Sequence, residues 1–242
     1  MIYPGSKRRI AHHIIPLMLK HRAARAWVEP FVGGANSIQY VTGRRIGNDK
    51  NEYVIALLKA VRDGWRPPTY ITEDEYKHYK QLSAKGLVPG NDMALAGFIL
   101  TQCPFGGRWW GGFGRCGNGR IRAEEASRGL IAQAKHLQGI TFHTGDYDTF
   151  PIPLNSLIYC DPPYIGRPVY RDKIDHVKFW DWCRYLVRKG HSVYVSEYVA
   201  PEDFISVWSG QLINQIDATR KNVRRETEQL FVHRSATALL NM

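Results

Sequence analysis

The sequence predicts an α/β fold built on a mostly parallel sheet with one antiparallel strand. Short runs of strand-forming residues alternate along the chain with segments whose apolar residues recur at helical spacing, and glycines bound the strands. Alternation of this kind is typical of a parallel sheet covered by helices. The chain then ends in two strand-like segments, 212–216 and 228–233, joined by a polar linker. This ending predicts a hairpin, and hence an antiparallel strand at or near one edge of the sheet.

Length and composition indicate a basic globular protein. The 242 residues suffice for one domain with an insertion. Lys and Arg total 33 against 22 acidic residues, a formal net charge of +11 that favours a polyanionic partner such as nucleic acid. No run is apolar enough to span a membrane and no signal-peptide core follows the N-terminus, so we expect a cytoplasmic protein. The four cysteines lack metal-ligand spacing, so no metal site is predicted.

The N-terminal residues 3–7 read Tyr-Pro-Gly-Ser-Lys and precede a predicted helix. Ser6 can cap this helix. Lys7 would then lie in the first turn, where the helix dipole does not favour a cation. From this stretch alone, Lys7 is either the partner of a ligand carboxylate or a solvated lysine.

A glycine turn follows the predicted strand end at 27–28. Gly33 and Gly34 permit close approach to the backbone, and the polar residues after them can cap a helix that begins near Ile38. Strand, glycine turn and helix together form the plan of a nucleotide cradle. Here the turn can pack on an adenosyl group or on its amino-acid tail.

An acidic residue, Asp49, closes the second predicted strand. An acid in this position after a glycine turn is expected to hold ribose hydroxyls. Asn48 and Asn51 are natural cap residues for the helix predicted over 53–61, so helix capping is the competing interpretation of the cluster.

Residues 65–135 differ from the segments on either side, because a Pro-Pro break near their start interrupts the α/β alternation. A Thr72-Glu-Asp-Glu75 capping box predicts one helix, and a second is predicted from Asn91 to Gln102. We therefore assign residues 1–64 and 136–242 to the core and residues 65–135 to an insert.

The insert contains a glycine-rich loop with interleaved arginine and aromatic residues. Such side chains suit phosphate contact, groove readout and base stacking. A surface hairpin with its tryptophans partly in the core is the less favoured alternative. The basic linker 218–226 is either a second phosphate clamp, which its charge density favours, or a solvated loop. The predicted DNA contacts are Arg108, Trp109, Trp110, Arg115, Arg120, Arg122, Lys221 and Arg224.

The chemistry is predicted at Asp161-Pro162-Pro163-Tyr164. The apolar run before it predicts a strand, which two prolines cannot continue. A carboxylate, two stiff carbonyls and an aromatic ring then lie at the edge of the sheet where ligands bind. Asp161 and the Pro162 carbonyl can each accept one hydrogen of a planar amino group, and Tyr164 can stack on an extruded base. An ordinary Pro-Pro turn is the alternative.

The order of these segments resembles the Dam-type (alpha-group, D12 class) DNA adenine methyltransferases along nearly the whole chain. The ending from Arg224 to His233 is similar to the last block of that family. The segments that carry the resemblance are Tyr3-x-Gly5-x-Lys7, Glu29-Pro-Phe-Val-Gly-Gly, Asn48-Asp49-x-Asn51, Gly145-Asp146 and Asp161-Pro-Pro-Tyr164.

This resemblance implies a Rossmann-like methyltransferase fold, S-adenosylmethionine as the methyl donor and an insert that recognises the DNA target. It implies that Lys7 lies near the carboxylate of the donor, that Asp49 holds the ribose and that Asp161 faces both donor and target amine. The implied donor-binding residues are Tyr3, Lys7, Glu29, Phe31, Gly33, Asp49, Asp146 and Asp161. The implied catalytic residues are Asp161, Pro162, Pro163 and Tyr164.

The implied reaction is direct methylation of the exocyclic amino nitrogen of adenine in double-stranded DNA after base flipping. Three alternatives remain. They are methylation of the N4 amino group of cytosine, a DNA-binding protein with a decayed, inactive site, and the less favoured methylation of RNA or of a protein glutamine, whose enzymes usually carry Asn where this chain has Asp161. The resemblance also implies a bacterial or phage-infected cell, where the enzyme works either beside a cognate restriction endonuclease or as an orphan phage methylase. It predicts neither the recognition sequence nor the oligomeric state.

Overall fold

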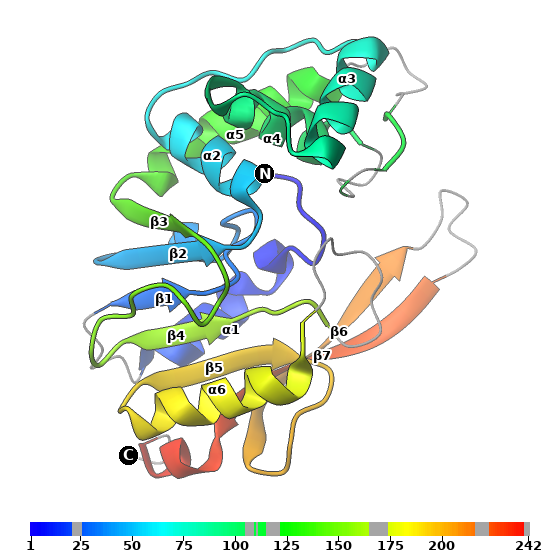
Figure 1. Ribbon diagram of the computed structural model, residues 1–242. Coiled ribbons are helices and arrows are strands. Elements are labelled where there is room, and N and C mark those ends of the chain that lie inside the picture. The colour runs from blue at the N-terminus through cyan, green and yellow to red at the C-terminus, as the bar shows by residue number, and fades with distance from the viewer. Residues whose placement is uncertain are drawn as a thin grey trace.

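A seven-stranded sheet forms the centre of the computed structural model, which describes residues 1–20, 26–104, 109, 111–114, 122–164, 174–215 and 223–239 (Figure 1). The strand order is β3-β2-β1-β4-β5-β7-β6. All neighbouring pairs from β3 to β5 are parallel, whereas β7 is antiparallel to both β5 and β6. The prediction of a Rossmann-like, mostly parallel sheet with one antiparallel strand near an edge is therefore confirmed. The strands are β1 (Trp27–Glu29), β2 (Arg45–Asp49), β3 (Ile140–Thr144), β4 (Leu157–Cys160), β5 (Ser192–Glu197), β6 (Phe204–Gln215) and β7 (Val223–His233).

Helices connect the strands and cover both faces of the sheet. None of the helices in the described ranges is long and apolar enough to cross a membrane. The α-helices are α1 (Ala11–Lys20), α2 (Glu52–Arg62), α3 (Glu73–Lys85), α4 (Met93–Gln102), α5 (Arg122–Leu137) and α6 (His176–Arg188). The 3-10 helices are η1 (Lys7–Arg9), η2 (Ile38–Tyr40), η3 (Gly90–Asp92) and η5 (Arg234–Leu239).

Alternate residues of the strands point to opposite faces, so the sheet separates two hydrophobic clusters. Trp27 and Tyr159 belong to the cluster shared with α1, α2, α4 and α5. Val28 and Ile158, their neighbours in sequence, belong to the cluster packed against α6, which lies in front of β5 in Figure 1. Because β1 and β4 are buried on both faces, their sequences are continuously apolar until Glu29 at the end of β1 and Asp161 directly after β4.

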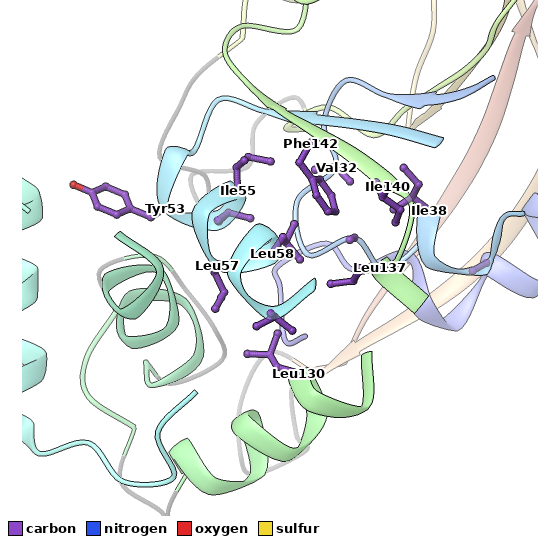
Figure 2. Packing of buried hydrophobic residues seen from close by; sticks show 14 of the residues in the cluster. Val32, Ile38, Tyr53, Ile55, Leu57, Leu58, Leu130, Leu137, Ile140 and Phe142 are labelled. Carbon is purple, nitrogen blue, oxygen red and sulfur yellow. The ribbon is translucent and has the colours of Figure 1, made fainter. Parts of the chain in front are cut away.

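Helix α2 joins the sheet to the helices of the predicted insert. Figure 2 shows its Leu57 and Leu58 among apolar side chains of α5 and β3. Helix α4 crosses α2 so closely that a Cβ at Gly97 would lie 2.2 Å from the Tyr53 carbonyl oxygen. Glycine permits this contact because it has no Cβ. Helices α4 and α5 thus share one core with α2, although they lie in the segment predicted as an insert.

Several predicted caps are present. The Thr72–Glu75 capping box starts α3, and the Asn51 side chain accepts hydrogen bonds from the first amides of α2. The prediction of a helix from Ile38 was wrong, because only the 3-10 helix η2 forms before the chain enters β2. The final hairpin is also longer than predicted. Its ladder continues to the Gln215–Val223 pair, because backbone pairing tolerates polar side chains, and Arg224 lies within β7 instead of in the linker.

Candidate active site

The carboxyl ends of three parallel strands bring acidic residues to one edge of the sheet. Glu29 ends β1, Asp49 ends β2 and Asp161 follows β4. The buried Asn48 side chain ties the neighbouring loops together, because its amide donates to the carbonyls of Pro30 at 3.2 Å and Gly145 at 2.9 Å. The resulting edge is the position where open α/β sheets bind ligands.

One cavity of about 340 Å³ opens at this edge. Every residue predicted to bind the donor lines it: Tyr3, Lys7, Glu29, Phe31, Gly33, Asp49, Asp146 and Asp161. Of the remaining residues predicted to be catalytic, Pro163 also lines the cavity, whereas Pro162 and Tyr164 are buried behind it. The segments of the resemblance thus converge on a common space, although they are dispersed along the chain.

The glycine turn is packed against an aromatic ring. Gly33 has a φ of 46°, and a Cβ at this position would lie 2.6 Å from the Tyr3 ring. A Cβ at Gly34 would also clash with Tyr3, at 2.8 Å. Both positions therefore require glycine, because a side chain there would clash with Tyr3. Tyr3 thus packs on part of the turn against which the sequence predicted a ligand.

Asp49 anchors this turn to the start of α2. One oxygen of its carboxylate accepts from the Gly33 amide at 2.8 Å, and the other accepts from the Asn51 amide at 2.9 Å. The capping interpretation therefore holds for Asn51, while Asp49 organises the backbone around the cavity. A carboxylate without a proton only accepts hydrogen bonds, so Asp49 presents an acceptor to the cavity that it lines.

Two buried glutamines hold the N-terminal segment beside the turn. The Gln102 side chain, at the end of α4, accepts from the Ile2 amide at 3.0 Å and donates to the Ile2 carbonyl at 2.9 Å. Gln133 of α5 donates to the Gly34 carbonyl at 3.0 Å. The sequence analysis missed both residues, although a glutamine shortly after the apolar run Phe98–Leu100 is a recognisable signal for Gln102.

Lys7 is the best-connected cation of the site. It is only 4% exposed, which excludes the solvated interpretation. Its ammonium lies 2.8 Å from Oδ1 of Asp161, 3.1 Å from Oε1 of Glu228 and 2.9 Å from the Gly5 carbonyl oxygen. These contacts direct the Lys7 ammonium to protein groups, and the shortest of them is to Asp161. Its predicted contact with a donor carboxylate remains a prediction.

Tyr164 is buried beneath this lysine. Its ring centroid lies 4.6 Å from the Lys7 nitrogen and 4.7 Å from the Tyr198 ring, which it meets edge to face. Its hydroxyl donates to Glu228 at 2.8 Å. The structure thus joins Tyr164 to the Lys7–Asp161 pair, and its stacking on a base stays a prediction.

Burial changes the protonation of two carboxyl groups in the cavity. The pKa of Asp161 is raised to about 6, mainly by burial and further by the Glu228 carboxylate, while Lys7 opposes the rise. The pKa of Glu29 is raised to about 8 by burial and by nearby Asp161, against a hydrogen bond from Trp27. At neutral pH Glu29 is therefore mostly protonated and Asp161 mostly ionised.

The cavity lining is acidic in a chain that is basic as a whole. The described lining residues include the carboxyl groups of Glu29, Asp49, Asp146, Asp148, Asp161 and Asp175 but only three lysines, Lys7, Lys50 and Lys178. Since the chain carries a formal charge of +11, this local reversal favours a cationic ligand. Within the described ranges, no cluster of His, Cys, Asp and Glu is suited to hold a metal ion.

The predicted DNA contacts are only partly described. Trp109 lines the cavity, and its ring lies 5.5 Å from that of Tyr53. The Arg122 guanidinium donates to the Pro104 carbonyl, and an antiparallel bridge between Pro104 and Phe113 closes the glycine-rich loop. Placing one tryptophan against the core agrees with part of the hairpin alternative. The other predicted DNA contacts lie outside the described residues: Arg108, Trp110, Arg115, Arg120, Lys221 and the side chain of Arg224.

Comparison with known families adds independent information about the first third of the chain. No curated protein matches the sequence. The matched segment, residues 3–87, contains Tyr3, Lys7, the glycine turn and Asp49, while Asp146 and Asp161 lie beyond it. The matched family consists of enzymes, and with the sheet it supports DNA adenine methylation. Over residues 3–87 the chain is similar to the D12 class N6 adenine-specific DNA methyltransferases.

Proposed function

We propose that this protein transfers a methyl group from S-adenosylmethionine to the exocyclic amino nitrogen of adenine in double-stranded DNA, after the target base is flipped out of the helix. The observation that carries the proposal is the single cavity lined by Lys7, Asp49 and Asp161, which come from three distant parts of the chain. The family match over residues 3–87 supports the adenine as the target.

The cavity fits the proposed donor chemically. When bound, S-adenosylmethionine supplies an electrophilic methyl group on a sulfonium, and it also carries an ammonium, so an acidic lining suits it. Asn36 lines the cavity, and its buried Oδ1 atom has no hydrogen-bond partner among the described residues, so its side chain carries an acceptor suited to such a cation. Phe31 and Tyr147, whose rings stack with centroids 5.3 Å apart, offer an apolar wall for the adenine ring beside Asp146.

Asp161 is the group that meets the target amine in this proposal. An exocyclic amine is a poor nucleophile because its lone pair is delocalised into the ring. The ionised carboxylate accepts one amine hydrogen, and the Pro162 carbonyl, for which Pro163 offers no competing N–H, accepts the other. This arrangement turns the lone pair out of the ring plane. As the nitrogen becomes positively charged, the carboxylate stabilises it, and orientation alone contributes roughly 7–11 kcal/mol to lowering the barrier.

We further propose that residues 1–64 and 136–242 form the catalytic core and that residues 65–135 recognise the DNA target. The basic net charge, the arginine-rich loop and the position of Trp109 at the cavity support this division. The proposed reaction places the protein in the cytoplasm of a bacterial or phage-infected cell, with or without a cognate restriction endonuclease.

The decisive experiment incubates the protein with unmethylated DNA and S-adenosylmethionine, followed by digestion and mass analysis of the nucleosides. We expect N6-methyladenine, and N4-methylcytosine would instead support the alternative amino target. Calorimetry with S-adenosylmethionine separates both from a decayed site, which would bind the donor poorly. Sequencing of DNA from a methylation-free host that expresses the protein would then reveal the recognition sequence.

A further inference from the structure

We propose that Glu228 is a positioning residue for this reaction: it holds Lys7 and Tyr164 against Asp161 and thereby fixes the direction and the electrostatic environment of the carboxylate that meets the amine. The inference rests on the proposed methyl transfer. It concerns a residue in β7, near the end of the chain and outside the segment that matches the methyltransferase family.

The contacts of Glu228 connect two groups of the site. Its side chain is 2% exposed, and its Oε1 atom accepts a hydrogen bond from the Tyr164 hydroxyl at 2.8 Å. The same oxygen lies 3.1 Å from the Lys7 nitrogen, which in turn lies 2.8 Å from Oδ1 of Asp161. Glu228 is not among the residues that line the cavity, so it acts on a bound substrate only through these neighbours.

Glu228 fixes the position of the Lys7 ammonium. The Lys7 ammonium contacts Asp161, Glu228 and the Gly5 carbonyl. Without the Glu228 carboxylate, the ammonium would stay beside Asp161 but would be held less firmly at the end of its flexible stem. Because Lys7 contacts one oxygen of Asp161, a less firmly held ammonium would also leave the Asp161 carboxylate less firmly oriented.

Glu228 also sets the charge around Asp161. Among the described residues, the ionisable groups that interact with Asp161 come from several elements and include Lys7, Glu29, Tyr159, Cys160, Tyr164 and Glu228. Among them Lys7 lowers the pKa of Asp161, whereas the Glu228 carboxylate raises it. Because one cation, Lys7, is shared by the carboxylates of Asp161 and Glu228, the three groups together carry a net negative charge. This charge stabilises the positive charge that develops on the amine nitrogen.

The test compares two substitutions of Glu228 with a control. Glu228→Gln keeps the size of the side chain and removes its charge, and Glu228→Asp keeps the charge but shortens the reach to Lys7. The control is Asp203→Asn, which breaks a bidentate ion pair with Arg184. For each protein, the titration of Asp161 is followed by carboxyl-carbon NMR, assigned with Asp161→Asn. Single-turnover methyl transfer from S-adenosylmethionine to unmethylated DNA is measured across the same pH range.

We expect Glu228→Gln to lower the titration midpoint of Asp161, to move the acid limb of the rate profile in the same direction and to slow transfer at neutral pH by about tenfold or more. Glu228→Asp should give an intermediate result and serves as the test if Glu228→Gln does not fold. The control should change neither titration nor rate.

An unchanged Asp161 titration in Glu228→Gln would overturn the proposal, whether or not the protein is active. A shifted titration with an unchanged rate would overturn the role of Glu228 in the reaction. If the unsubstituted protein transfers no methyl group, the proposed function fails instead, and the NMR titration still decides whether Glu228 controls Asp161.

Discussion

The ammonium of Lys7 lies 2.8 Å from Oδ1 of Asp161, so the N-terminal segment and the end of β4 meet in one buried ion pair. Glu228 and the Gly5 carbonyl complete the surroundings of the ammonium. Removing one partner of a buried pair leaves the other charge uncompensated, which makes each residue sensitive to substitution. The geometry of this pair leads to the first two predictions.

Asp161→Ala should reduce methyl transfer by about a hundredfold or more, because the carboxylate that accepts the amine hydrogen and stabilises its charge is lost. The fold should remain because Lys7 keeps Glu228 as a partner, and most DNA binding should remain because Asp161 is not among the predicted DNA contacts. Initial rates of methyl transfer and fluorescence anisotropy with labelled DNA measure the two properties. Asp181→Ala, which removes a more exposed carboxylate from α6, is the control. Full activity of Asp161→Ala would end the catalytic assignment.

The rate of methyl transfer should fall as the pH drops through about 6, because the raised pKa of Asp161 allows its carboxylate to be protonated there. Lys7→Met should move this limb to higher pH, since the ammonium lowers the pKa of Asp161. Single-turnover rates in matched buffers measure the pH at which methyl transfer falls on the acid side. Lys77→Met, in the exposed part of α3, should leave this pH unchanged. An unchanged pH in Lys7→Met would show that the ion pair does not control the titration of Asp161.

Glu29 should make the protein less stable as the pH rises. Its pKa is about 8 in the folded state against an ordinary value of 4.5, so the folded protein binds the extra proton between these values and stability is lost as the pH increases through them. The loss is on the order of 4 kcal/mol. Denaturant unfolding should show that Glu29→Gln loses much of this pH dependence, whereas Glu52→Gln, at the exposed start of α2, retains it. Equal slopes in all three proteins would contradict the prediction.

Gln102→Leu should weaken binding of S-adenosylmethionine, although Gln102 does not line the cavity. The substitution leaves the buried amide and carbonyl of Ile2 without their partner, which costs about 1–3 kcal/mol of stability and loosens the segment that carries Tyr3. Calorimetry with the donor and thermal unfolding measure both effects. Gln81→Leu, at an exposed position of α3, is the control. Unchanged donor affinity in a destabilised Gln102→Leu protein would confine Gln102 to a structural role.

Arg115→Ala and Arg120→Ala should weaken DNA binding and reduce its salt dependence, because each removes a predicted phosphate contact. Arg122→Ala should differ from both by lowering thermal stability, since its guanidinium donates to the Pro104 carbonyl. Titrations at several salt concentrations measure the slope for all three variants. Unaltered binding by Arg115→Ala and Arg120→Ala at low and moderate salt would favour the hairpin interpretation of the loop.

The sequence by itself determined the local elements whose signals are short in range. The capping box at Thr72 predicted the start of α3, and the prolines after Asp161 predicted the end of β4, because both depend on neighbouring backbone groups. The order of the motifs also led to eight predicted donor-binding residues, all of which lie among the residues that line one cavity. Helix α5 was not predicted, because its amphipathic segment follows the glycine-rich loop and was grouped with it.

Only the tertiary structure decided which groups each of these residues contacts. A contact between Lys7 and Glu228 leaves no local pattern, because it depends on the position of β7 in the sheet. The same holds for Gln102 and Ile2, whose hydrogen bonds join the N-terminal segment to the end of α4. Patterns report the periodicity and the caps of one segment, whereas burial and pairing of charges arise only when segments distant in sequence pack together.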